Sequence, residues 1–117
     1  MSVYLVNFCR GISDKAAVEA YWKRVGESYS DKGKVLAAYT PFEVLEGDIP
    51  IWGIVVLEFP TMVEAKAWYF GPEYQEIKKL REGAQDNICA LVEGGWVAAA
   101  DRQPPANWQS RAMESPK

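Results

Sequence analysis

The chain has 117 residues, 49% of them hydrophobic and 25% charged, and its 13 basic and 16 acidic residues give a net charge of -3. It contains no histidine, which excludes Ser-His-Asp relays, His-ligated zinc or iron, and haem held by a proximal histidine. The basic residues are scattered, so no nucleic-acid partner is expected, and no apolar run reaches the roughly 18 residues of a membrane helix.

The first half of the chain predicts two strands around a helix. Residues 3–9 are rich in β-branched and aromatic residues, as is typical of a strand. Ser13 is predicted to cap a helix whose apolar residues recur at steps of three and four, and Gly33 is predicted to end it. Residues 35–46 are apolar but include Pro41, which cannot donate to a sheet ladder, so we expect an edge or bulged strand.

The second half predicts the same order of strand, helix and strand. Residues 53–59 form a nearly continuous apolar run, as expected for a central strand covered on both faces. Thr61 and Glu64 match a capping box that opens a helix, which Gly71 and Pro72 interrupt before a second helical piece that ends near residue 83. Residues 87–93 are predicted to be the last strand.

This order predicts an α+β fold of the ferredoxin-like βαββαβ type, with an antiparallel sheet and both helices on one face. Tyr4, Val6 and Phe8 would then make the other face of the first strand apolar. We therefore expect a second copy of the chain to cover that face in a two-fold homodimer. The first and last strands would be neighbours, which could bring Cys9 and Cys89 close as buried, inert thiols.

Composition changes after residue 95. Residues 96–117 contain a Pro-Pro pair, many polar residues and no period, which is typical of a disordered segment. Trp96, Trp108 and Met113 could nevertheless anchor it. We expect a domain over residues 1–95, followed by a tail that packs on the partner subunit. The absence of a signal-like start and the two widely spaced cysteines favour a cytoplasmic location.

Two charged side chains are the sharpest candidates for chemistry. Glu58 is a carboxylate inside the apolar run of residues 53–59, so it could be an acid or base with a raised pKa, or it could lie solvated at the strand end. Arg81 lies near the apolar side of its predicted helix. It could bind the carboxylate of a ligand or form a structural ion pair with Glu58 or Glu73.

Several aromatic and polar residues could line a pocket. Tyr69, Tyr74 and Trp22 suit a flat or apolar small molecule, although aromatic residues at helical spacing also fit a simple core. Asn7 is polar within an apolar strand and could bond either a ligand or the backbone at the sheet margin.

Four segments, in this order and spacing, closely resemble the DUF1330 family, a bacterial family of domains of unknown function. They are EVLEGD (43–48), VVLEFPTM (55–62), AKAWYFGPEYQEIKKLREGA (65–84) and LVEG (91–94). The resemblance implies a ferredoxin-like subunit that forms a dimeric α/β barrel. It implies no reaction, because the wider superfamily includes cofactor-independent monooxygenases, isomerases, haem-associated enzymes and structural dimers.

The chain departs from the family pattern at residues 38–41 (AYTP), where relatives commonly carry a basic-Gly-Gly stretch. If this segment borders a pocket, we expect a ligand preference that differs from that of relatives.

Two hypotheses follow. The first is a homodimer that binds a small apolar or carboxylate-bearing molecule between sheet and helices, without a cofactor or metal, using Glu58, Arg81, Tyr69 and Tyr74. Cofactor-independent chemistry is part of this hypothesis only if Glu58 faces the pocket. The second is a non-catalytic dimer whose aromatic residues are core and interface. A cavity of roughly a few hundred Å³ lined by these four side chains favours the first hypothesis, and a filled interior favours the second.

Overall fold

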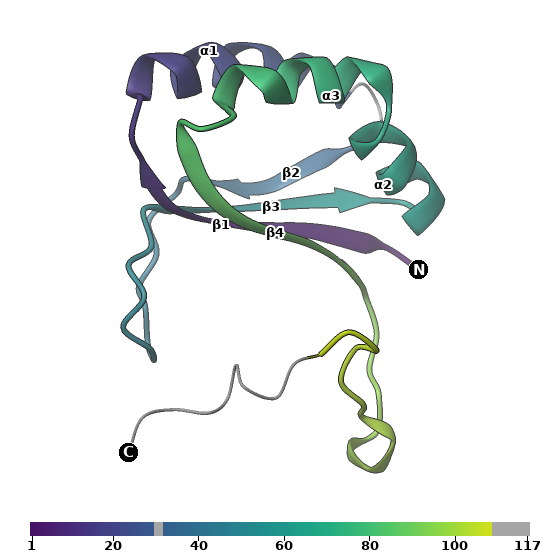
Figure 1. Cartoon of the computed structure of the whole chain (residues 1–117). Helices are drawn as coiled ribbons and strands as arrows, with labels where there is room; N and C mark the ends of the chain where they lie inside the picture. The colour runs from purple at the N-terminus through teal and green to yellow at the C-terminus, as the bar shows by residue number, and fades with distance from the viewer. Residues whose placement is uncertain (30–31, 109–117) are drawn as a thin grey trace.

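Four antiparallel strands form one sheet in the order β2-β3-β1-β4 (Figure 1). The strands are β1 (Val3–Ile12), β2 (Lys34–Ala38), β3 (Gly53–Phe59) and β4 (Gln85–Glu93). The structure is a computed structural model and describes residues 1–29 and 32–108. With the helices between the strands, this arrangement confirms the predicted ferredoxin-like βαββαβ fold.

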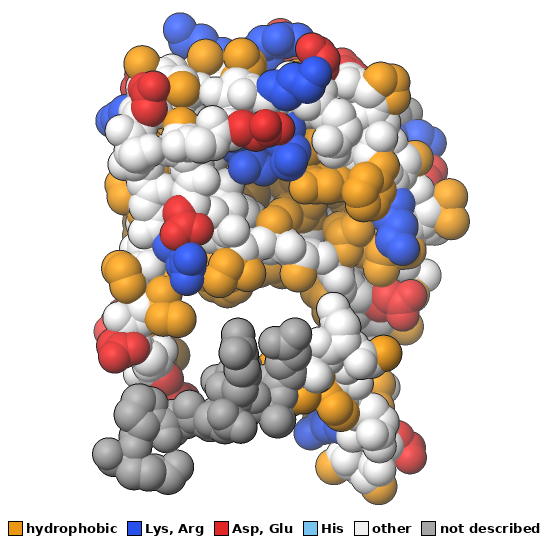
Figure 2. Space-filling view, viewed as in Figure 1, with side chains coloured by type: hydrophobic (Ala, Val, Ile, Leu, Met, Phe, Trp, Pro, Cys, Tyr) orange, Lys and Arg blue, Asp and Glu red, His pale blue; other side chains and the backbone are white. Residues whose placement is uncertain are grey.

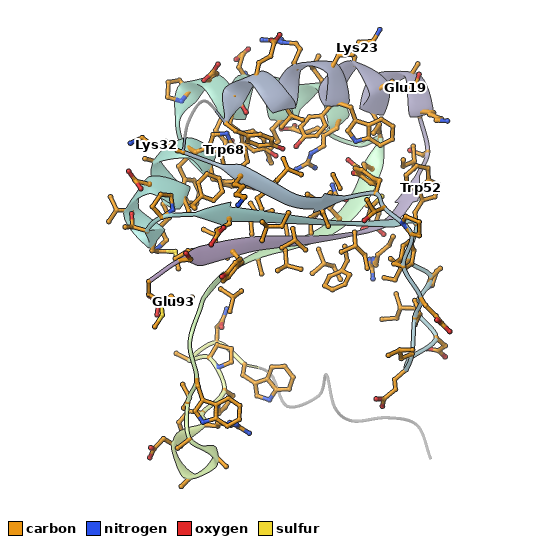
Figure 3. All side chains as sticks on the ribbon, turned by 180° about the vertical axis from the view of Figure 1, so that it is seen from behind. Glu19, Lys23, Lys32, Trp52, Trp68 and Glu93 are labelled. Atoms are coloured by element: carbon orange, nitrogen blue, oxygen red, sulfur yellow. The ribbon has the colours of Figure 1, made fainter. Side chains whose placement is uncertain are left out.

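The helices lie over one face of the sheet. They are α1 (Lys15–Ser28), α2 (Met62–Tyr69) and α3 (Pro72–Lys78), which the short 3-10 helix η1 (Lys79–Arg81) continues. A second 3-10 helix, η2 (Ala99–Asp101), lies in the segment after β4, beyond the opposite face (Figure 1). Helices α1 and α3 run above the sheet, and α2 lies near its edge (Figure 1). Glu19 and Lys23 lie on the outer side of α1, away from the sheet (Figure 3). Among the described residues, no helix has the length and apolar character needed to cross a membrane.

The start of α1 differs from the prediction by one residue. Asp14, rather than Ser13, is the N-cap, and its carboxylate accepts a hydrogen bond from the backbone amide of Ala17 at 3.2 Å. The Ser13 hydroxyl instead donates to the Gly83 carbonyl at 3.2 Å. Ser13 therefore ties the start of the helix to the turn before β4.

Strand β2 is shorter than the predicted residues 35–46. It ends at Ala38, because Tyr39 has a positive φ of 57° and turns the chain out of the sheet. Tyr39 packs directly on Gly53, where a Cβ atom would lie 2.3 Å from the Tyr39 ring. Only a glycine at this position leaves room for the turn. Residues 39–52 form the long connection to β3.

The core lies between the sheet and the helices. Its larger cluster contains Val3, Leu5, Leu57, Phe59 and Ala65, and a smaller cluster contains Val25, Tyr74 and Ile77. Trp68 lies in this layer (Figure 3), where its indole donates to the buried Ser28 hydroxyl at 2.9 Å. Thr61 caps α2 as predicted, accepting from the amide of Glu64 at 3.1 Å.

The other face of the sheet is apolar and has no cover within the described part of the chain. Phe8, Ile88 and Val92 keep 38%, 50% and 50% of their surface exposed there. Residues 39–52 and the segment after β4 both extend beyond this face (Figure 1), and Figure 2 shows hydrophobic side chains along it. Trp96 in the second segment is 84% exposed. Trp108, the second predicted anchor, is 46% exposed, and Met113, the third, lies outside the described residues.

Candidate functional site

A small cavity lies between the helices and the sheet. Its volume is about 60 Å³, and its polar lining includes Asn7, Tyr21, Tyr39, Tyr74, Arg81, Gln85 and Asn87. Sites for drug-sized ligands measure roughly 300–1,000 Å³. The cavity is thus smaller than the binding hypothesis specified, yet the interior is not filled. It fits a ligand of a few heavy atoms.

A tyrosine pair and an arginine form one wall of the cavity. The hydroxyls of Tyr21 on α1 and Tyr74 on α3 are hydrogen-bonded at 2.8 Å. Arg81, at the end of η1, donates from Nη2 to the Tyr74 hydroxyl at 3.2 Å and places its guanidinium over the Tyr21 ring, 5.0 Å from the centroid. The aromatic rings and the hydroxyl thus fix the position of the guanidinium.

Arg81 has no acidic partner on this wall. The ion pairs among the described residues involve other basic side chains, so the structural pairs with Glu58 or Glu73 that the sequence left open do not form. Its guanidinium is half-buried and stays charged at neutral pH. Partial removal of a cation from water is unfavourable unless an anion compensates for it.

A second group of aromatic residues surrounds Tyr39. The Tyr39 hydroxyl accepts two hydrogen bonds, one from the Trp22 indole at 3.2 Å and one from the Gln85 side-chain amide at 3.1 Å. Trp22 stacks on Trp52 with ring centroids 6.0 Å apart, and Trp52 meets the Tyr39 ring edge-on at 5.7 Å. These contacts hold Tyr39 in its unusual backbone conformation.

Amide side chains of β1 and β4 form the floor of the cavity. Asn7 donates from Nδ2 to the Asn87 side-chain oxygen at 3.3 Å. Gln85 donates from Nε2 to Tyr39 and also reaches the Cys9 thiol at 3.3 Å. The remaining oxygens, Asn7 Oδ1 and Gln85 Oε1, are buried and have no hydrogen-bond partner in the described part of the chain.

Burial dominates the electrostatics of the tyrosines. Burial, and then the neighbouring Tyr74, raise the pKa of Tyr21 well above its ordinary value, although Arg81 opposes the shift. Burial also raises the pKa of Tyr29, which lines the cavity, to about 12. Both phenols are therefore neutral at physiological pH. Arg81 is the only charged side chain among the described residues that line the cavity.

The structure brings together four of the six predicted site residues. Arg81, Tyr74, Asn7 and Trp22 all line the cavity. Tyr69 is not part of the lining, and its ring packs against Tyr74 with centroids 5.2 Å apart.

Glu58 lies on the opposite face of the sheet. It pairs with Tyr4 on β1 and Lys34 on β2, whereas its neighbours Leu57 and Phe59 are buried under the helices. Side chains alternate along a strand, so the Glu58 carboxylate points away from the cavity. It does not meet the condition set for a catalytic carboxylate there.

The hydrogen-bonded lining of the cavity includes residues that were not predicted as site residues: Tyr21, Tyr39, Gln85 and Asn87. Alternation along the last strand could have identified two of them, Gln85 and Asn87, because both lie on the helix-facing side. Gln85 was missed because β4 starts there, two residues before the predicted start. The family comparison pointed at the segment containing Tyr39 without assigning it a role.

The two cysteines are free thiols. Cys9 is buried as expected, but Cys89 is exposed. Cys9 pairs with Asn87 and Cys89 with Asn7, so the thiols face the same side of the sheet on neighbouring strands. Burial of the Cys89 thiol itself, which borders the cavity, raises its pKa despite the nearby Arg81. Because its pKa is raised, the Cys89 thiol is a weak nucleophile, although the residue is exposed and Arg81 is near.

Solved structures share this fold. A protein of unknown function from Rhodopseudomonas palustris has a TM-score of 0.65 and 18% identity, covering 82% of this chain and 84% of that one. SnoaB, a cofactor-independent oxygenase from Streptomyces nogalater, has a TM-score of 0.53 and 11% identity, covering 84% and 97%. A dimeric ferredoxin-like protein of unknown function from Bacteroides fragilis has a TM-score of 0.52 and 14% identity, covering 80% and 95%.

At these identities the similarity shows the fold alone. No curated protein sequence matches the chain significantly. Residues 2–95 match the sequence profile described as domain of unknown function DUF1330, which agrees with the four segments that carried the resemblance.

Proposed function

The chain belongs to the DUF1330 family, and from its cavity we propose that it is a homodimeric protein that binds a small carboxylate-bearing molecule between its sheet and its helices. The position of Arg81 carries this proposal. Its guanidinium is half-buried on the cavity wall and held by Tyr21 and Tyr74, and no carboxylate of the described residues pairs with it. A ligand carboxylate would supply the missing anion and accept the guanidinium donors that remain.

A homodimer is supported by the uncovered face of the sheet. Phe8, Ile88 and Val92 form an apolar surface that a second copy would bury. The two segments that extend beyond this face (Figure 1) would lie on either side of that copy, with Trp96 and Trp108 packed on it. The neighbour from Bacteroides fragilis is described as dimeric, which favours the same assembly here.

Cofactor-independent chemistry stays a prediction. SnoaB, which has a similar fold, is described as a cofactor-independent oxygenase, but the carboxylate that we considered as acid or base here, Glu58, points away from the cavity. A reaction on the bound acid would have to use the tyrosine hydroxyls or Arg81. The cytoplasmic location expected from the two cysteines also stays a prediction.

Binding can be measured by NMR titration of the full-length protein with two small acids, lactate and isobutyrate. The indole resonance of Trp22 is the reporter, because Trp22 lines the cavity. We expect saturable shifts with at least one acid, and loss of at least about tenfold in affinity in Arg81→Met, as for a charged hydrogen bond. Arg24→Met, on the exposed side of α1, is the matched control.

Two results would contradict the proposal. One is that neither acid shifts the cavity resonances. The other is that Arg81→Met, still folded, binds both acids as well as the Arg24→Met control does. Either result would favour the alternative of a structural dimer without a ligand.

A further inference from the structure

We propose that the ligand is a small hydroxycarboxylate, whose carboxylate pairs with Arg81 and whose hydroxyl donates to Asn7 Oδ1 or Gln85 Oε1. This inference rests on the proposed function and adds the second half of the ligand. The two unpaired amide oxygens of Asn7 and Gln85, both residues of the cavity lining, carry it.

The orientation of both amides is fixed by their nitrogen atoms. Asn7 Nδ2 is committed to the Asn87 oxygen, and Gln85 Nε2 to the Tyr39 hydroxyl and the Cys9 thiol. Their oxygens are therefore left as acceptors, each buried and without a donor among the described residues. Buried acceptors are nearly always satisfied in proteins, so a donor from outside the chain is expected at this floor.

The charge of the lining selects a neutral donor. Among the described lining residues Arg81 is positive and no side chain is acidic. A ligand ammonium would add a second buried cation without a carboxylate to balance it, which is unfavourable. A hydroxyl can donate to the amide oxygens without adding charge.

A hydroxyl also matches the donors that remain on the wall. The Tyr39 hydroxyl already accepts two hydrogen bonds, so its own proton is available to a ligand oxygen. Whichever of Tyr21 and Tyr74 donates in their 2.8 Å hydrogen bond, the other keeps a proton to donate. The cavity therefore offers both donors and acceptors to a hydroxyl, and a cationic donor to a carboxylate.

Cavity size limits the rest of the molecule. A volume of about 60 Å³ leaves little space beyond the carboxylate and the hydroxyl. A two- or three-carbon skeleton is the expected size.

Lactate and isobutyrate are the matched probes, because they differ only in a hydroxyl that a methyl group replaces. Both are titrated into the full-length protein, using each enantiomer of lactate, and dissociation constants are taken from the Trp22 indole resonance. We expect one enantiomer of lactate to bind at least about tenfold more tightly than isobutyrate, the effect of one hydrogen bond to a buried acceptor.

Two substitutions locate the origin of that preference. Gln85→Met removes one acceptor with little change in volume, and Asn7→Leu removes the other. We expect the preference for lactate to fall to within about threefold of isobutyrate in at least one variant. Gln103→Met, exposed in the C-terminal segment, is the control and should keep the full preference. If Asn7→Leu does not fold, Gln85→Met together with the wild-type ratio decides.

The outcomes separate this inference from the proposed function. Equal binding of both acids, lost in Arg81→Met, would overturn the hydroxycarboxylate and leave carboxylate binding standing. A preference for lactate that survives in both folded amide variants would also overturn the hydroxyl contact. Binding of neither acid would overturn both proposals.

Discussion

Tyr39 combines backbone strain, packing and a place in the cavity. Its φ of 57° is uncommon for a residue with a side chain and costs of order 1–3 kcal/mol. The ring contacts with Trp22 and Trp52 and the two hydrogen bonds to its hydroxyl offset that cost. It stands in residues 38–41, where the sequence comparison led us to expect a departure from the DUF1330 pattern. The expectation that a changed segment at the cavity alters ligand preference therefore applies to Tyr39 in particular.

Glycine at position 53 should be required for this arrangement. A Cβ atom there would lie 2.3 Å from Tyr39 Cδ1 and 2.7 Å from Cε1, and neighbouring rings keep Tyr39 from moving away. We expect Gly53→Ala to lower the free energy of unfolding by about 1–3 kcal/mol in urea denaturation, as overpacking does. On α1, a Cβ atom added at Gly26 would meet nothing within 4 Å, so Gly26→Ala should instead raise the free energy of unfolding by about 0.5–1 kcal/mol. If Gly53→Ala were as stable as the wild type, the Tyr39 ring would be free to move away from the added methyl group.

The buried tyrosines predict a loss of stability in alkali. In the unfolded chain Tyr21 and Tyr29 ionise near their ordinary pKa of 10.0, whereas in the folded protein burial raises the pKa of Tyr29 to about 12 and that of Tyr21 further. The unfolded state therefore releases protons first, and the free energy of unfolding should fall as pH rises from about 10 to 12.

Urea denaturation at several pH values between 8 and 11 checks this dependence, in a range set by the ordinary pKa of tyrosine, about 10. The double variant Tyr21→Phe/Tyr29→Phe should lose less stability over this range than the wild type does. Tyr4→Phe, on the other face of the sheet, is the control. The explanation fails if the double variant keeps the slope of the wild type, or if Tyr4→Phe reduces it equally.

At the scale of elements, the hydrophobic pattern predicted the order and type of the strands and helices, but not all their ends. Ser13 and Asp14 are both good N-cap residues, and the choice of Asp14 depends on the contact of Ser13 with Gly83, which is 70 residues away in sequence. Strand β2 ends at Tyr39 because of a ring that packs on Gly53. Contacts between distant segments set both ends, and a local pattern cannot contain them.

The same reason explains which site residues were predicted. Arg81 and Asn7 stood out as polar residues beside apolar ones, and Tyr74 and Trp22 stood out as aromatic residues at helical spacing. Glu58 stood out equally, yet the parity of its strand turns it to the other face. The unpaired oxygens of Asn7 and Gln85 depend on hydrogen bonds across the sheet and could be recognised only in three dimensions.

The N-cap of α1 gives a prediction at this scale. Asp14→Ala removes the acceptor for the Ala17 amide and should lower the free energy of unfolding by about 1 kcal/mol. Asp14→Asn keeps a side-chain oxygen at the same place and should lie close to the wild type in the same thermal or urea unfolding experiment. If Asp14→Asn were as unstable as Asp14→Ala, the charge rather than the cap would be responsible.

On the scale of the whole molecule, the two faces of the sheet differ in burial and in what packs on them. The face under the helices carries the core and the polar cavity, and its residues are mostly buried. The opposite face is apolar yet exposed, and two extended segments border it (Figures 1 and 2). An apolar surface of this kind is unfavourable in water, which favours a partner on that face. The proposed dimer interface and the cavity therefore lie on opposite sides of one sheet.

The proposed dimer can therefore be broken without touching the cavity. Ile88 lies opposite Phe8 in the register of β1 and β4 and is 50% exposed in a single chain, so a lysine there is tolerated in a monomer but would be buried in the dimer. In sedimentation equilibrium we expect a wild-type mass of about twice the 13.1 kDa chain, and a monomer for Ile88→Lys. Val63→Lys, 78% exposed on α2, should remain dimeric. A monomeric wild type, or an Ile88→Lys variant that dimerises as tightly as Val63→Lys, would rule out this face as the interface.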